Sequence, residues 1–295
     1  MSYLWVGFTL AAAAGQTARN AMQRDLSDSL GAAGATHVRF LFALPFALLF
    51  VLAVSIWRRA ALPTPGLAFF GWMAAGALTQ IVATLLMLLT MQHRSFVVSI
   101  AFLKMEPVIT AVLGFIFLGD KLTALMIAAI LLATFGMLLI SLKPGGGQAG
   151  LKPALLGLAS GVFFAASAVG FRGAILALPH TDFILAATFT LLAGLLLQSA
   201  VMSLWLRITQ PGTLTRMMRS WKMCSTAGLI AALTSEFWFL AFALATAASV
   251  RTLGMADVVF AQAVSHRMRQ HVSLREMTGI AILLAGGALL VWAHG

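Results

Sequence analysis

Glu236 is the residue of this chain whose position most clearly suggests chemistry. It lies within the apolar stretch 233–240, near the middle of a longer hydrophobic run, and an ionisable side chain at such a depth usually faces a cavity or a partner. A carboxyl group there can bind a cation or carry a proton. The alternative is a structural partner for a basic residue elsewhere. We therefore interpret Glu236 as a candidate for both substrate binding and coupling.

Lys104 and Glu106 lie in another apolar run, directly before Pro107. Proline removes a backbone donor and frees the carbonyl of Leu103, so we expect a kink there. Side chains two positions apart point roughly 200° apart on a helix, so Lys104 and Glu106 are not expected to pair with each other. Lys104 is a candidate for holding a substrate carboxylate. For Glu106 and Pro107 we favour a purely structural helix break.

Arg251 lies near the start of a third run that also contains charges. It shares a helix face with Gln262, so both residues are candidates for lining a binding cavity. Asp257 lies on another face and is expected to pair with Lys104 or with an arginine, which makes it a second coupling candidate. The alternative for Arg251 is a position at the level of the lipid headgroups.

Neutral polar residues share helix faces in two further runs. Gln16 and Asn20 are four residues apart, as are Gln80 and Thr84. Gln16, Gln80 and Thr84 can hydrogen-bond a substrate, or they can simply connect neighbouring helices.

The elements that must position these residues are membrane-spanning helices. Of the 295 residues, 61% are hydrophobic and 9% are charged, and the mean hydropathy is +0.99. A spanning helix needs about 20 apolar residues, and about ten stretches satisfy this. The sequence therefore predicts an all-α integral membrane protein with spans at residues 3–22, 36–57, 66–92, 95–118, 121–142, 153–177, 182–206, 222–247, 249–269 and 273–293.

Composition excludes several other classes of protein. The net charge of +11 comes mostly from residues at helix ends, where they anchor helices to phospholipid headgroups, so no nucleic-acid partner is expected. The single cysteine, Cys224, excludes a disulfide framework and a cysteine metal cluster. His266 and His271 lack the spacing of a helical metal site. Without a nucleotide-binding or catalytic motif, we expect no cofactor, no metal and no enzymatic activity.

The glycine-rich segment 143–152 divides the chain into two halves of about five spans each. Residues 1–142 and 153–295 are weakly alike. An odd number of spans in each half would give the two copies opposite orientations, which is the inverted repeat of many secondary transporters. The alternative is that any two apolar helices look similar.

Several stretches resemble the drug/metabolite transporter superfamily in its EamA-type branch. They are residues 39–44, residues 103–108, residues 118–122 and the run from Ser273 to Gly286. The resemblance covers the whole chain. It implies two five-helix units with a cavity between helices one, three, four, six, eight and nine, and it places Phe163 in that cavity. It also implies export of amino acids and other metabolites.

The second half departs from the family pattern at two places. Asp257 replaces the proline that the first half has at position 107, and Gln270 replaces the acidic residue that the first half has as Asp120.

Two expectations concern the membrane boundaries. Arg19 and Arg172 lie at corresponding helix ends, and we expect both to extend to the headgroups. Both chain termini are expected on the same side. The distribution of basic residues favours the outside, whereas the resemblance implies the inside, so the orientation stays open.

Together these features predict a multi-pass inner-membrane secondary transporter that exports small organic metabolites such as amino acids by alternating access. Its partners would be a small-molecule substrate, the lipid bilayer and a coupling ion such as the proton, and the protein would be a monomer or homodimer. The alternatives are a proton-coupled exporter of cationic drugs centred on Glu236 and a membrane scaffold that does not transport.

Overall fold

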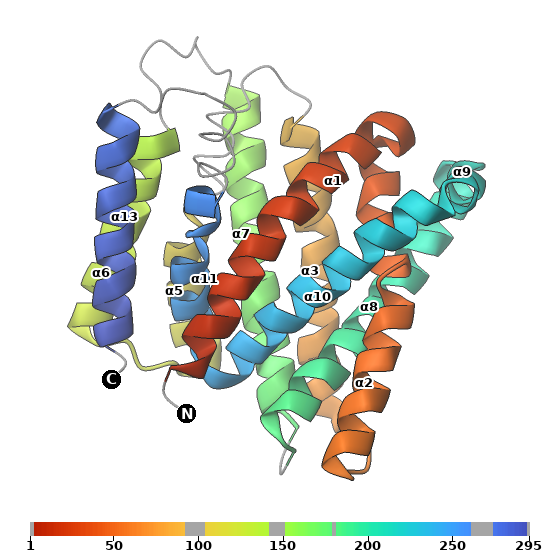
Figure 1. Cartoon of the computed structure of the whole chain (residues 1–295), viewed down its shortest axis with the longest axis horizontal. Helices are drawn as coiled ribbons and strands as arrows, with labels where there is room; N and C mark the ends of the chain where they lie inside the picture. The colour runs from red at the N-terminus through yellow and green to blue at the C-terminus, as the bar shows by residue number, and fades with distance from the viewer. Residues whose placement is uncertain (1–2, 92–103, 142–150, 179–180, 261–273, 294–295) are drawn as a thin grey trace.

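The computed structural model describes residues 3–91, 104–141, 151–178, 181–260 and 274–293, and these residues form helices and no strand. Figure 1 shows a single bundle of long helices. The helices are α1 Leu4–Leu41, α2 Leu44–Arg58, α3 Leu67–Met91, α5 Glu106–Leu118, α6 Ala124–Ser141, α7 Leu151–Leu176, α8 Phe183–Thr209, α9 Thr213–Arg219, α10 Trp221–Leu244, α11 Ala247–Gly254 and α13 Leu274–Trp292. Each of the ten expected spans contains at least one of them.

The first two spans differ from their expected boundaries. Helical structure continues past Met22 to Gly31, which adopts φ 74° and ψ 166° and interrupts α1. Glycine reaches this left-handed region without the steric cost of a Cβ atom. Helical structure then resumes, and the second span is divided again by a turn at Phe42 and Ala43 before Pro45. The expected loop after Met22 is therefore wrong, because the turn is made at Gly31.

Two of the charged spans contain turns near their charges. A turn at Lys104 and Met105 precedes α5, and Pro107 lies in the first turn of that helix. This agrees with an irregular backbone before the proline, and residues 92–103 lie outside the described part of the chain. In the second half, α11 ends at Gly254 and a turn follows at Met255 and Ala256. The backbone is thus irregular at both places.

Close helix packing relies on small residues, as the sequence suggested. The main partners are α1 with α10, α3 with α7 and α6 with α13. A Cβ atom on Gly76 of α3 would lie 2.9 Å from the backbone nitrogen of Phe171 in α7. On Gly136 of α6 it would lie 2.7 Å from the carbonyl oxygen of Gly279 in α13. Only glycine lets these backbones approach so closely.

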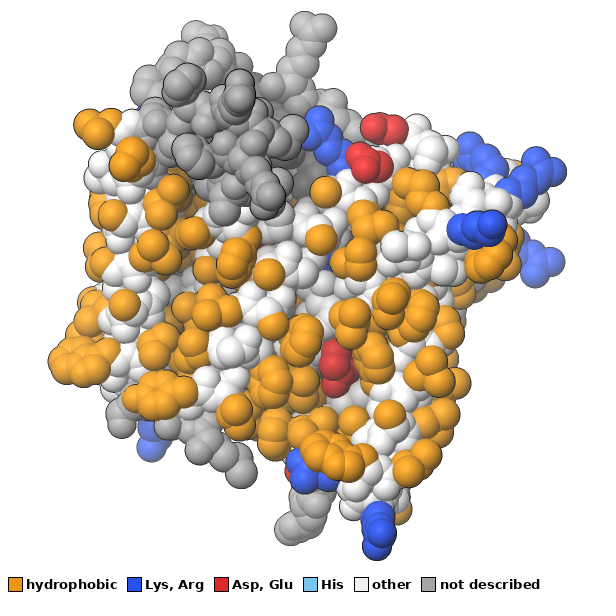
Figure 2. All heavy atoms as spheres, viewed as in Figure 1, with side chains coloured by type: hydrophobic (Ala, Val, Ile, Leu, Met, Phe, Trp, Pro, Cys, Tyr) orange, Lys and Arg blue, Asp and Glu red, His pale blue; other side chains and the backbone are white. Residues whose placement is uncertain are grey.

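Long apolar helices dominate the surface. Five helical stretches are long and apolar enough to cross a membrane, and α5, α6 and α13 are shorter apolar helices. Figure 2 shows hydrophobic side chains over most of the visible face, with basic side chains mainly at its margins. Among the basic residues near the margin are Arg216 and Arg219 on the short helix α9, a segment that was expected to be a loop.

The two ends of the bundle's chain lie together. Tyr3 and Trp292 line the same apolar groove between α1, α11 and α13, and the termini lie near each other in Figure 1. This agrees with the expectation that both termini lie on one side.

Candidate functional site

A central cavity lies where α1, α3, α5, α7, α10 and α11 meet. The centres of water-sized molecules have about 100 Å³ of free space there. These helices belong to the six spans that the resemblance implied, and the second span adds Arg39. The described residues that line the cavity are Gln16, Arg19, Asn20, Arg39, Gln80, Met87, Lys104, Glu106, Pro107, Phe164, Phe171, Ser235, Trp238, Phe239, Phe242, Arg251, Gly254, Met255 and Asp257.

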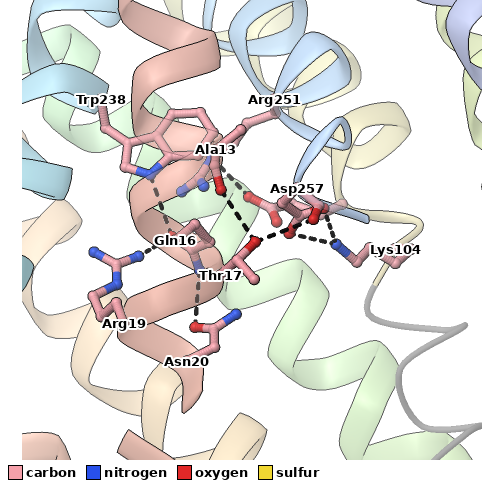
Figure 3. A network of polar contacts seen from close by, with 10 residues as sticks. Ala13, Gln16, Thr17, Arg19, Asn20, Lys104, Trp238, Arg251 and Asp257 are labelled. Carbon is pink, nitrogen blue, oxygen red and sulfur yellow. Dashed lines mark hydrogen bonds and ion pairs between the residues drawn. The ribbon is translucent and has the colours of Figure 1, made fainter. Parts of the chain in front are cut away.

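Lys104 and Asp257 form an ion pair at one wall of the cavity, as Figure 3 shows. Lys104 Nζ lies 3.0 Å from each carboxylate oxygen of Asp257, and both side chains are largely buried. The backbone carbonyl of Asp257 also accepts a hydrogen bond from Thr17 Oγ1 at 3.1 Å. The expected pairing of Asp257 with Lys104 is confirmed. Each break in the two halves contributes one member of the pair.

Arg251 and Glu106 form a second ion pair between the same two interrupted spans. Arg251 Nε lies 2.8 Å from Glu106 Oε1. Glu106 lies in the first turn of α5, where the helix dipole favours a negative charge. Sequence reasoning treated Glu106 as part of a structural break. Its position in the apolar run beside Lys104 was the signal for a charged wall.

The Trp238 ring covers the Arg251 guanidinium and the end of α11. The guanidinium carbon lies 4.8 Å from the ring centroid, which is a cation–π distance. A Cβ atom on Gly254 would lie 2.3 Å from the ring carbon Cη2, so only glycine leaves room for this ring. The indole nitrogen donates to Gln16 Oε1 at 3.3 Å.

Gln16 is the centre of a polar network on α1, seen in Figure 3. Its amide nitrogen donates to Asn20 Oδ1 at 3.2 Å, and its oxygen accepts from Arg19 as well as from Trp238. The shared face expected for Gln16 and Asn20 is therefore present.

Arg19 and Arg39 are the two cavity cations that sequence reasoning missed. Arg19 is only 4% exposed and Arg39 only 5%, so the expected extension of Arg19 to the headgroups is wrong. Arg19 Nη1 donates to Ser235 Oγ at 3.3 Å, and Arg39 Nη1 donates to Thr84 Oγ1 at 3.2 Å. A helix-end position cannot reveal in which direction an arginine folds. The signal for Arg39 was its place inside an apolar stretch.

Arg172 is held differently. It pairs with Asp120 at 3.5 Å, donates to the carbonyl of Phe242 at 2.6 Å and also to that of Ala245. The expected extension of Arg172 to the headgroups is therefore wrong as well. These contacts connect α7 to the ends of α5 and α10.

Glu236 lies outside the cavity lining. Its Oε1 accepts a hydrogen bond from Thr188 Oγ1 of α8 at 2.7 Å, and its Oε2 is buried without a hydrogen-bond partner. Thr84, another sequence candidate, is fully buried against Arg39 and also does not line the cavity.

Of the remaining residues that the sequence suggested for the site, some line the cavity and others do not. Gln80 lines the cavity and accepts a hydrogen bond from Gln198 Nε2 at 2.8 Å. Phe164 lines the cavity in place of Phe163, which is partly buried and packs in a neighbouring cluster. One helical position separates wall from packing here. Gln262 lies outside the described residues. Among the described residues, no group of three or more possible metal-binding side chains occurs.

Known proteins resemble this chain in fold and, over its first half, in sequence. One solved crystal structure, described only as that of a protein, is 14% identical and has a TM-score of 0.66, with 97% of this chain and 99% of the other covered; this similarity shows the fold alone. No curated protein sequence matches the chain at a significant level. Residues 3–142 match the model of the EamA-like transporter family, which is part of the drug/metabolite transporter superfamily. Over these residues the chain, a multi-pass membrane protein, is similar to the EamA-like transporter family.

Proposed function

We propose that this protein is a secondary transporter that binds a small organic metabolite in the central cavity and exports it across the inner membrane by alternating access. The observation that carries the proposal is the cavity itself, in which charged and amide side chains from five of the expected spans face one space. Polar groups inside a bundle of apolar helices are typical of a solute pathway.

The helix pairings support an inverted repeat of residues 1–142 and 153–295. If the halves correspond, α1 matches α7 and α3 matches α10. The operation that relates the halves then maps the α1–α10 pair onto the α7–α3 pair. It maps α6 onto α13, so the α6–α13 pair is mapped onto itself. Two halves with this relation can rock about a site at their interface.

The two breaks support binding at that interface. Transporter sites are commonly built from interrupted helices whose freed backbone groups and helix ends face the substrate. Here the breaks beside Lys104 and Asp257 lie at the cavity wall. Gln16, Gln80, Lys104 and Arg251 supply hydrogen bonds and charge, and Phe164 and Trp238 supply an apolar surface.

Glu236 is proposed as the coupling residue. One of its carboxylate oxygens is buried without a hydrogen-bond partner, and the residue does not line the cavity. Both features suit a proton carrier better than a substrate ligand. Glu236→Gln should abolish substrate accumulation driven by an imposed pH gradient while leaving counterflow at equal pH intact. Thr188→Val, which removes the hydrogen bond to Glu236 and keeps the carboxyl group, is the matched control and should retain part of the gradient-driven uptake. Unchanged gradient-driven uptake in Glu236→Gln would remove Glu236 from this role.

The cavity charge argues against the alternative of a cationic-drug exporter. The described lining contains four basic side chains, Arg19, Arg39, Lys104 and Arg251, and only two acidic ones, Glu106 and Asp257. A formal excess of positive charge repels a cationic drug.

Counterflow in proteoliposomes tests the proposal. Liposomes preloaded with an unlabelled solute should accumulate its labelled form only when they contain the protein. The panel includes amino acids, organic anions and a quaternary ammonium drug. Uptake of the drug alone would favour the cationic-drug exporter. Absence of flux for the whole panel, with intact folded protein, would favour a membrane scaffold.

A further inference from the structure

Arg19 and Arg39 are two buried cations whose hydrogen-bond partners, among the described residues, are all neutral. Both line the central cavity and are at least nine-tenths buried. Their side-chain partners are Ser235 and Gln16 for Arg19, and Thr84 for Arg39. The Nε atom of Arg19 is buried without any hydrogen-bond partner. A buried guanidinium group that lacks a counter-charge is strongly unfavourable within a bilayer.

The structure describes the side chains of seven of the eight acidic residues, and none of these seven pairs with Arg19 or Arg39. Ion pairs with Arg251, Lys104, Arg172 and Arg58 occupy Glu106, Asp257, Asp120 and Asp182. Glu236 bonds to Thr188, and Asp25 and Asp28 are exposed.

The two arginines are close enough to repel each other and Arg251 electrostatically. A guanidinium group presents a planar fork of donors that matches carboxylate and phosphate oxygens in two-point contacts. Two such forks lining one cavity are suited to two negative charges on one ligand. The charge of the whole described lining also matches a ligand with two negative charges, because four cations and two carboxylates leave a formal charge of +2.

We propose that Arg19 and Arg39 form a dianion subsite, so that the substrate of the cavity is a small organic dianion such as a dicarboxylate or a phosphomonoester. This inference rests on the proposed transport function and specifies its substrate class. The bound dianion would neutralise the two unpaired arginines, while the ion pairs Lys104–Asp257 and Arg251–Glu106 remain intact. Gln16, Asn20 and Gln80 are then available for the uncharged polar groups of the same molecule.

Binding can be measured without any assumption about transport. The full-length protein is purified in detergent, and its Tm is followed with increasing succinate or glycerol 3-phosphate. The matched probes with less charge are butyrate and glycerol at equal ionic strength. We expect both dianions, or one of them, to raise Tm at concentrations where the matched probes do not. A response to only one dianion identifies whether the chain accepts carboxylates or phosphate esters.

Variants locate the effect. Arg19→Gln and Arg39→Gln should each weaken the dianion response by about tenfold or more, because each removes a charge-assisted contact. Arg19→Lys and Arg39→Lys should restore part of it and also control for folding. Arg24→Gln, an exposed arginine on the same helix α1, should leave the response unchanged.

Counterflow with the same probes separates this inference from the proposed function. Dianion binding that depends on both arginines, without flux of any solute, would retain the subsite and overturn transport. Flux of monoanionic or zwitterionic solutes that Arg19→Gln and Arg39→Gln leave unchanged would retain transport and overturn the dianion subsite. Equal stabilisation by butyrate and succinate in the wild-type protein would also overturn it.

Discussion

Arg19 and Arg172 occupy corresponding places near the ends of apolar stretches in the two halves of the chain, but the fold uses them in opposite ways. Arg172 is held by the Asp120 carboxylate and by two backbone carbonyls. Arg19 lines the cavity and contacts only neutral side chains. Arg172 has an acidic partner in Asp120, whereas Arg19 has none among the described residues. Arg172 therefore connects α7 to the ends of α5 and α10, and Arg19 is available to a ligand.

The helix breaks of the two halves differ in a similar way. The first break has Pro107 behind a lysine and a glutamate, whereas the second has Gly254 ahead of an aspartate. Proline causes a break by removing a backbone donor. Gly254 instead leaves room for the Trp238 ring beside the chain. The same interruption is thus obtained by different means, and the opposite charges beside the two breaks attract each other.

Arg172→Gln should give the largest loss of stability. The change leaves Asp120 buried and uncompensated and removes donors from two carbonyls, which costs about 3 kcal/mol. Thermal unfolding in detergent measures the loss. Arg58→Gln is the control, since the side chains of the Arg58–Asp182 pair are 35% and 33% exposed and such a pair contributes less than about 1 kcal/mol. Equal Tm values for the two variants would contradict a stabilising role for the contacts of Arg172 with Asp120 and the two carbonyls.

Lys104→Met should have the next largest effect. It leaves Asp257 without its cation, and the coupling between the two side chains is expected to be about 2 kcal/mol. The exchange of Lys104→Asp with Asp257→Lys should recover much of the stability that either single change loses. A double-mutant cycle of unfolding free energies measures this coupling. Additive losses would mean that the two side chains do not stabilise the junction of the breaks.

Gly254→Ala should be moderately destabilising. The new methyl group would overlap the Trp238 ring and displace it from Arg251, at a cost of about 1 to 2 kcal/mol. Gly287→Ala on α13 is the matched control, because its Cβ atom would meet only Leu253 at an ordinary 3.6 Å. Tm should fall in the first variant and stay nearly constant in the second. A tolerated Gly254→Ala would show that the ring can move freely.

Arg19→Gln should have the smallest effect on stability in the absence of ligand. It removes a cation that repels Arg39 and Arg251. The free energy of unfolding should therefore change by no more than about 0.5 kcal/mol, as for other mild substitutions, or rise. The contrast in Tm with Arg172→Gln is the decisive comparison. A loss as large as that of Arg172→Gln would mean that Arg19 also serves a structural purpose.

Particular residues show how far sequence reasoning reached. It anticipated the pairing of Lys104 with Asp257, because few charges lie at membrane depth and opposite charges there must find each other. It also anticipated an irregular backbone before Pro107. It did not anticipate the continuation of α1 to Gly31, because the polar residues after Met22 give no continuous apolar signal. It selected Phe163 where Phe164 lines the cavity, and it set Glu106 aside although Glu106 pairs with Arg251.

The sequence by itself determined that this chain is a multi-span helical membrane protein with a break at Pro107 and charges inside its spans. Length, hydropathy and proline chemistry are local properties, so a single sequence suffices for them. Only the tertiary structure decided which charges cancel. Arg19, Arg39 and Arg172 are alike in sequence, but a guanidinium group has a long flexible stem, and its partner depends on helices that lie far away along the chain. The approach of α1 to α10 and of α5 to α11 leaves two of these arginines at the cavity wall without a carboxylate.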